Sequence, residues 1–270
     1  MRTPQPTTTR LAYGPETLQF SYLHLPISEE AHPVVILIHG GFWRNPYTYT
    51  LMTSMAEDLA QRGIAAWNIE YRRVGDKGGG WPGTLLDVAL AADYLRTIAA
   101  RYKLDLNRIV TIGHSAGGQL ALWLAARRKI TLDSPLAVAN SPDAPPLALR
   151  GAISLAGVND LERSWQFNLG SGAATELLGG SVTSVPERYA AASPAAMLPL
   201  GIPQVLIHGT EDDRVPYAMS ESYLADAQAA GDDIQLITLE GEDHFVLIDI
   251  QAAAWEKTVQ ALRTLLGLDE

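Results

Sequence analysis

The stretch "TIGHSAGGQLALWLAARR", residues 111–128, passes from a β-branched run through a glycine-flanked serine into an alanine- and leucine-rich segment. No proline or polar linker separates the two halves, so the pattern predicts a strand that turns directly into a helix. Ser115 lies at this turn, within a G-x-S-x-G pattern in which glycines permit an abrupt turn and leave the serine exposed. Ser115 is therefore a candidate nucleophile, and the alternative is that it only caps the helix.

Short apolar runs alternate along the chain with longer segments of helical pattern. We expect strands at 33–40, 64–72, 108–115, 151–157, 203–209 and 234–241, and helices near 50–61, 84–101, 116–128, 218–230 and 246–266. Most strand segments are apolar on both faces, as buried parallel strands are. The pattern predicts an α/β fold with a mostly parallel, doubly wound sheet and helices on both faces. A hairpin near 11–26 is a candidate for an antiparallel start.

Length and composition favour one large domain over residues 1–270, because 270 residues with 47% hydrophobic content can bury one sizeable core and no linker is evident. Two connections are long. The segment 130–150 is proline-rich, and the segment 162–200 mixes glycine, serine and proline with a short helical piece. We interpret both as candidate lid segments.

Charge and residue usage exclude several classes of function. The net charge of −10 leaves no basic face for nucleic acid or anionic membranes, and the absence of cysteine excludes disulfides, thiolate nucleophiles and cysteine-bound zinc. The first residues lack the apolar stretch of a secretory signal, and no apolar run approaches the ~18 residues of a membrane span. We expect a cytoplasmic protein without a metal or other cofactor.

A serine hydroxyl needs a base to remove its proton, and the base needs an acid to orient it. "LIHGTEDDRVP", residues 206–216, follows a late strand and offers Glu211, Asp212 and Asp213 as the acid. "LEGEDHF" follows the last strand and offers His244 as the base. The order serine, acid, histidine is the one expected for a serine at a strand-to-helix turn. Spacing alone leaves the choice among the three acids open.

"IHGGFWR", residues 38–44, follows the first long apolar strand and predicts an oxyanion hole. Attack on a carbonyl creates an oxyanion, which fixed backbone N–H groups stabilise. We expect Gly41 and Phe42 to donate from this loop, with Ala116 adding the amide after the nucleophile; the alternative is a simple turn. His39 is expected to be structural.

These motifs together make the chain resemble an α/β-hydrolase over about residues 11–266. Its "HGGFW", "EYRR", "GHSAGG", "HGTEDDRVP" and "GEDHF" are similar to those of an esterase group that contains hormone-sensitive lipase-like carboxylesterases, feruloyl or acetyl esterases and kynurenine formamidases. The resemblance implies Ser115 as nucleophile, Asp212 as acid through the H-G-x-x-D-x-x-V-P pattern, and His244 as base. Lipase-like relatives often have HGGG at this position. The aromatic pair Phe42 and Trp43 after "HGG" is more similar to the HGG-aromatic-W motif of kynurenine formamidases.

The glycine loop "GDKGGGWPGT", residues 75–84, carries one tryptophan, and its "GGGWPGT" part lacks the Lys-Ser/Thr pair with which a phosphate-binding loop leads into a helix. We expect Trp81 over the substrate pocket with Trp43 and Phe42 opposite it, because aromatic walls suit flat acyl or aryl groups. The alternative is that Trp81 anchors its loop to the core.

The sequence therefore predicts a serine hydrolase that cleaves small carboxylic esters through an acyl-enzyme. The alternative is an arylformamidase that hydrolyses N-formylkynurenine. A prolyl oligopeptidase-type peptidase is disfavoured because no propeller domain is encoded, and a non-catalytic receptor because all three triad candidates are present. The expected partner is a small-molecule substrate; the oligomeric state is not predicted.

Overall fold

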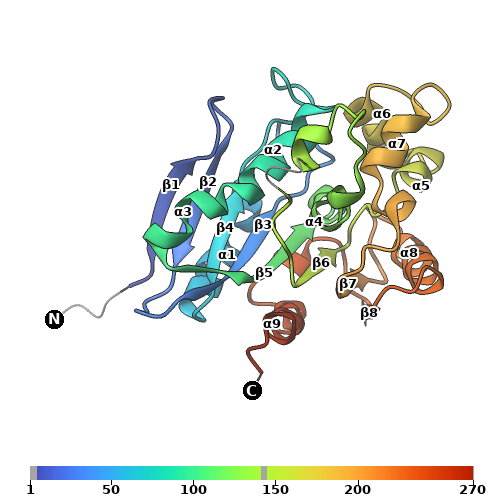
Figure 1. Ribbon diagram of the computed structural model, residues 1–270. Helices are drawn as coiled ribbons and strands as arrows, with labels where there is room; N and C mark the ends of the chain where they lie inside the picture. Colours follow the sequence, from blue (N-terminus) through green and yellow to red (C-terminus); the bar gives the residue numbers. More distant parts are fainter. Residues whose placement is uncertain (1–4, 141–144, 270) are drawn as a thin grey trace.

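The strands form one eight-stranded sheet in the order β1-β2-β4-β3-β5-β6-β7-β8 in the computed structural model, which describes residues 5–140 and 145–269 (Figure 1). The pairs β1–β2 and β2–β4 are antiparallel, and all others are parallel, which confirms the mostly parallel sheet. The strands are β1 Thr7–Ala12, β2 Phe20–Leu25, β3 His32–Ile38, β4 Ala65–Ile69, β5 Leu104–His114, β6 Gly151–Leu155, β7 Gln204–Gly209 and β8 Ile234–Leu239.

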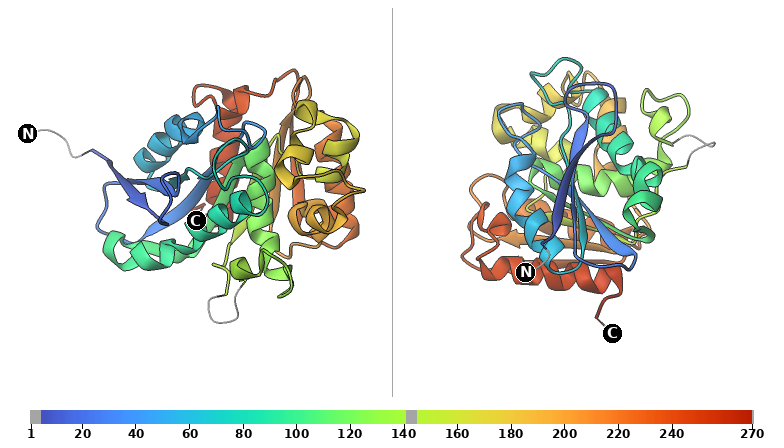
Figure 2. Two further views of the ribbon diagram at one scale, coloured as in Figure 1. Left: turned by 90° about the horizontal axis from the view of Figure 1, so that it is seen from above. Right: turned by 90° about the vertical axis from the view of Figure 1, so that its left-hand side faces the viewer.

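Helices cover both faces of the sheet, as the sequence pattern predicts (Figure 2). On one face α1 and α9 pack with alternate residues of the central strands, and on the other α2, α4 and α8 pack with the intervening ones. The helices are α1 Thr53–Gln61, α2 Gly83–Asp93, α3 Leu95–Tyr102, α4 Ala116–Ala126, α5 Leu161–Gln166, α6 Ala173–Leu178, α7 Pro186–Ala192, α8 Ala218–Ala229 and α9 Ala253–Leu266. No helix in the described ranges is both long and apolar enough to cross a bilayer.

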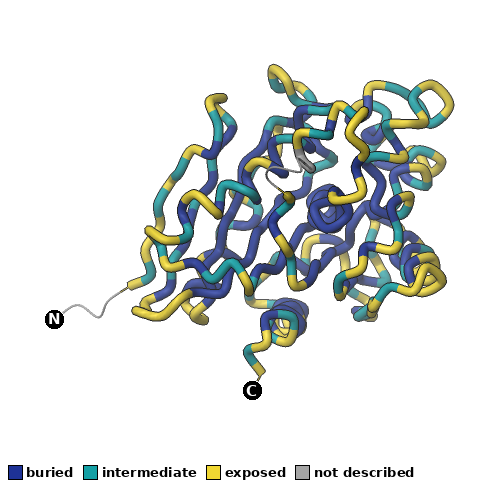
Figure 3. Tube along the Cα trace, in the orientation of Figure 1, coloured by how far each residue is buried: buried dark blue, intermediate teal, exposed yellow. Residues whose placement is uncertain are grey.

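Helix α4 runs through the middle of the molecule and all of its residues are buried (Figure 3). A helix that is apolar on every side is stable only where protein surrounds it. The alanine- and leucine-rich sequence after Ser115 therefore suits the buried position of α4, which lies between β5 and the outer helices. This buried strand-to-helix unit fixes the position of Ser115.

The elements differ from the sequence-based expectation mainly at their ends. The hairpin begins at Thr7, earlier than the expected residue 11. The pattern misses this start because β1 is an exposed edge strand, whose polar residues give little apolar alternation. The expected helix over 84–101 is divided at Tyr94 into α2 and α3. The last helix begins at Ala253, since the residues before it form a short 3₁₀ turn and a loop.

The two predicted lid segments have different structures. The segment 162–200 contains most of α5 and all of α6 and α7, more helix than the single short piece expected. The segment 130–150 is largely irregular, and its residues 141–144 lie outside the described residues.

Candidate active site

Ser115 occupies a strained backbone position at the carboxyl end of β5. Its φ of 57° and ψ of −122° lie outside the regions that residues with a side chain normally adopt. Glycines make the turn possible: a β-carbon on Gly113 would lie 1.9 Å from the carbonyl oxygen of Gly117, and one on Gly117 would lie 2.1 Å from that of Ile38. The Ser115 side chain makes no capping hydrogen bond to α4, which disfavours a purely structural role.

Asp212 lies just after β7 and its carboxylate is fully buried. Oδ1 accepts hydrogen bonds from the backbone N–H groups of Arg214 and Val215, each at 2.8 Å. Oδ2 lies 2.6 Å from Nδ1 of His244 and 3.1 Å from Nε2 of His208. Burial alone would raise the pKa of Asp212, but the hydrogen bonds from the two histidines and the backbone outweigh it and hold the pKa below its usual range. Asp212 is therefore a fixed anion.

His244 follows β8 and lines the same cavity as Ser115, which has a volume of about 120 Å³. Because the Asp212 carboxylate accepts a hydrogen bond from Nδ1, the proton is held there and Nε2 is left as the basic nitrogen. Asp213, by contrast, has a side chain that is 70% exposed and lies 3.3 Å from Nε of Arg214. Of the acids that spacing left open, the structure brings Asp212 to His244.

Three further histidines brace this arrangement. His208 Nε2 faces two acceptors, the Asp212 carboxylate and the carbonyl oxygen of Val215 at 3.0 Å, so it carries the hydrogen. His114 Nε2 donates to the backbone carbonyl of His244 at 2.9 Å. Under the predicted oxyanion loop, His39 contacts the buried Glu70 at 3.0 Å. The sequence predicts a structural role for His39, and its patterns do not reveal the partners of these three histidines.

His114 makes the folded protein sensitive to acid. Burial lowers its pKa to about 3, while the unfolded chain titrates near the ordinary value of 6.5. Between these values the unfolded chain binds a proton that the folded chain does not, so the free energy of unfolding decreases as the pH falls. We expect His114→Gln to reduce the loss of stability between pH 7 and pH 5 by about 2 kcal/mol, as urea titrations at both pH values would measure. An equal loss in both proteins would contradict this.

The loop after β3 turns through positive φ angles of 107° at Gly41 and 52° at Phe42. A β-carbon on Gly41 would lie 2.3 Å from Cβ of Tyr47, so only glycine fits there. Both loop residues line the cavity with Ser115, and Ala116 begins α4 beside it. Within the described part of the chain, the backbone N–H groups of Gly41, Phe42 and Ala116 donate to no protein acceptor. These N–H groups are therefore available to a ligand.

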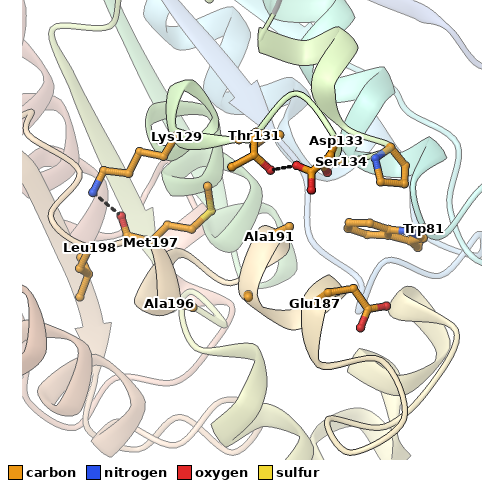
Figure 4. Close-up of a pocket in the computed structure, with 13 residues that line it drawn as sticks. Trp81, Lys129, Thr131, Asp133, Ser134, Glu187, Ala191, Ala196, Met197 and Leu198 are labelled. Carbon is orange, nitrogen blue, oxygen red and sulfur yellow. Dashed lines mark hydrogen bonds between the residues drawn. The ribbon is translucent and has the colours of Figure 1, made fainter.

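The two tryptophans predicted to contact substrate lie elsewhere. Trp43 is fully buried in the core, where its indole N–H donates to Oε1 of Gln119 at 3.0 Å, and it does not line the Ser115 cavity. Trp81 lines a second cavity of about 450 Å³ between the 129–135 segment, α7 and the residues that follow α7 (Figure 4). This cavity shares no lining residue with the one at Ser115.

Other side chains that line the Ser115 cavity are not identified by the sequence patterns. They are Tyr47, Leu51, Arg214 and Phe245. Arg214 and Phe245 are adjacent to motif residues, which is a signal that sequence could have offered, whereas Tyr47 and Leu51 carry none. Among residues 5–140 and 145–269, no group of three or more histidine or acidic residues could hold a metal ion.

Comparison with known proteins places the chain in a family. The BD-FAE family model matches residues 22–226. Esterase LipQ of Mycobacterium tuberculosis is 29% identical over 206 residues, 74% of this chain and 46% of that protein. Kynurenine formamidase avaC of Aspergillus versicolor is 34% identical over 143 residues, 48% of this chain and 44% of that protein. The chain thus spans less than half the length of these two relatives.

The fold has close counterparts among solved structures. A truncated carbohydrate esterase from gut microbiota superposes with a TM-score of 0.82 at 20% identity, covering 98% of this chain and 97% of that one. This agreement along almost the whole chain confirms the fold predicted from the serine turn and the alternating elements. The chain belongs to the BD-FAE family, and its fold is that of an α/β-hydrolase.

Proposed function

We propose that the chain is a serine hydrolase that cleaves small carboxylic esters through Ser115, His244 and Asp212. The observation that carries the proposal is the 2.6 Å contact between Nδ1 of His244 and Oδ2 of Asp212, beside a cavity that Ser115 also lines. Ser115 has a strained backbone and makes no helix-capping hydrogen bond. A serine of this kind beside an oriented histidine is the arrangement that activates a hydroxyl. The family membership and the esterase relatives support the same chemistry.

The proposed reaction uses these groups in turn. Ser115 Oγ attacks the ester carbonyl carbon while Nε2 of His244 takes the hydroxyl proton, and the Asp212 anion stabilises the imidazolium that forms. The backbone N–H groups of Gly41, Phe42 and Ala116 stabilise the oxyanion. His244 then returns the proton to the leaving alcohol. Water, deprotonated by His244, finally attacks the acyl carbon, and His244 returns that proton to Oγ of Ser115 as the bond to the acyl group breaks and the acid leaves.

The segment 162–200 is proposed to act as a lid. Gly170, within this segment, packs against the ring of Phe42: a β-carbon at Gly170 would lie 2.7 Å from Cδ1 of that ring. Phe42 in turn lines the Ser115 cavity. This contact couples the segment to one wall of the site.

The small cavity favours short acyl groups. The cavity encloses only about 120 Å³ and Phe42 lies in its wall, so a long acyl chain has no enclosed space to enter. In a series of p-nitrophenyl esters from acetate to decanoate, we expect kcat/KM for acetate or butyrate to exceed that for decanoate by at least about tenfold, or ~1.4 kcal/mol. A maximum at the longest chain would contradict the proposal.

Formamide hydrolysis is the second candidate function. The match to a kynurenine formamidase favours it, and the formyl group is the smallest acyl group the cavity could receive. Measuring kcat/KM for N-formylkynurenine beside the ester series separates the two. A formamide value far above that of every ester would replace the proposed function with this one.

A further inference from the structure

Arg214 is the one lysine, arginine or acidic residue among the described residues that line the Ser115 cavity. The remaining wall is formed by glycine, serine, histidine, leucine and aromatic residues. The chain as a whole carries a net charge of −10, so a cation beside the predicted nucleophile differs from the average surface. The positive charge of Arg214 favours a ligand that carries a negative charge.

The guanidinium of Arg214 is only weakly engaged by the protein. Its Nε lies 3.3 Å from Oδ1 of Asp213, and the two side chains are 54% and 70% exposed. An ion pair this exposed contributes little, because water screens it. The terminal nitrogens Nη1 and Nη2 have no hydrogen-bond acceptor within residues 5–140 and 145–269. These planar donors remain free to bind a carboxylate in a two-pronged contact.

The position of residue 214 relative to the predicted triad is nevertheless fixed. Its backbone N–H donates to Oδ1 of Asp212 at 2.8 Å, so the chain cannot move at this point without breaking a contact of the buried acid. The side chain thus extends from a rigid turn toward the cavity of Ser115 and His244. A group bound by the guanidinium would be held at a constant distance from the reacting atoms.

The geometry of the cavity indicates which part of a substrate Arg214 would meet. The enclosed volume of about 120 Å³ suits a small acyl group, so a larger leaving group must extend outward. The outward-facing lining residues are Arg214, Tyr47 at 44% exposure and Phe245 at 50% exposure. Two aromatic rings and a guanidinium match an aryl or alkyl leaving group that carries an anion.

We propose that Arg214 binds a carboxylate on the leaving group, so that the substrate class is short-acyl esters of hydroxy acids. This inference rests on the ester hydrolysis proposed above. It adds a specificity-determining residue and a charge requirement to that function.

Two esters that share an acetyl group test the inference. We compare 4-acetoxybenzoate, which is an anion, with its neutral methyl ester, and take the ratio of their kcat/KM values. Arg214→Gln should lower this ratio about tenfold, because a charge-assisted hydrogen bond to the carboxylate is lost. Arg214→Lys, which keeps the charge but not the planar fork, should lower it by about threefold.

Arg101→Gln is the matched control. Arg101 is exposed on α3 and does not line the cavity, so this variant makes the same change in net charge without removing a cation from the site. The ratio should remain that of the wild type. If Arg101→Gln and Arg214→Gln change the ratio equally, or if Arg214→Gln lowers both esters alike, the inference is wrong.

A binding measurement separates the carboxylate site from the proposed reaction. In the Ser115→Ala protein, calorimetry should give a Kd for 4-acetoxybenzoate about tenfold higher once Arg214 is also changed to glutamine. An unchanged Kd overturns the carboxylate site whether or not the protein hydrolyses esters. Normal binding with no hydrolysis by the wild type would instead overturn the proposed function.

Discussion

Replacing Ser115 with alanine is expected to abolish both ester hydrolysis and covalent labelling by a fluorophosphonate. Alanine removes the only atom that forms the acyl-enzyme, so kcat should fall by roughly 10⁵- to 10⁶-fold. It retains the β-carbon, and therefore keeps the strained backbone at φ 57° and the close contacts of the turn. The loss of activity should accordingly occur in a protein whose unfolding is close to that of the wild type.

Intact-mass analysis after fluorophosphonate treatment checks this expectation. The wild type should gain one adduct, and Ser115→Ala none, because only an activated hydroxyl attacks phosphorus at a useful rate. Ser28→Ala provides the control, since Ser28 is exposed and lies in the connection between β2 and β3. It should label like the wild type. An adduct that persists in Ser115→Ala would mean that another residue is the nucleophile.

The fold and the position of Ser115 could be predicted because they depend on local and repeated features. Buried parallel strands must be apolar on both faces, and a helix surrounded by protein must lack a polar side, so "TIGHSAGGQLALWLAARR" is constrained along its length. Gly113 is required by a backbone contact within the same turn, to Gly117, and Gly117 is required by a contact with the backbone of Ile38 at the end of the neighbouring strand. The structure of such a segment can therefore be predicted from its own residues.

The walls of the cavity could not be predicted in the same way, because the direction of a side chain depends on elements far away in the sequence. Trp43 follows directly after Phe42, yet its indole donates to Gln119 in the core while Phe42 lines the cavity. Tyr47 reaches the site only because the loop folds back over Gly41. Neither position shows a periodic pattern that distinguishes these outcomes.

The segment 162–200 illustrates a second limit. Its helices α5, α6 and α7 have six, six and seven residues, which is less than two turns each. Helices this short give no measurable apolar repeat and gain their stability from packing rather than from propensity. These helices therefore form because they pack on the core beneath them. The local sequence pattern does not reveal this packing.

Replacing Asp212 with asparagine is expected to lower kcat by about 10⁴-fold with little change in KM. The asparagine oxygen can still accept the backbone N–H groups of Arg214 and Val215 at Oδ1. Its amide NH₂ then occupies the place of Oδ2, where it meets Nδ1 of His244 and the hydrogen on Nε2 of His208. A donor facing Nδ1 moves the proton of His244 to Nε2. The base then has no lone pair for the Ser115 proton.

Asp213→Asn provides the matched comparison, since it makes the same chemical change one residue away on a carboxylate that is 70% exposed and 3.3 Å from Arg214. We expect kcat on a neutral ester such as p-nitrophenyl acetate to change by less than about threefold, because screened surface charges contribute little. Steady-state kinetics on both variants, with unfolding curves to show that each is folded, make the comparison. Equal losses, or a larger loss in Asp213→Asn, would show that the carboxylate in contact with His244 is not the one that orients it during catalysis.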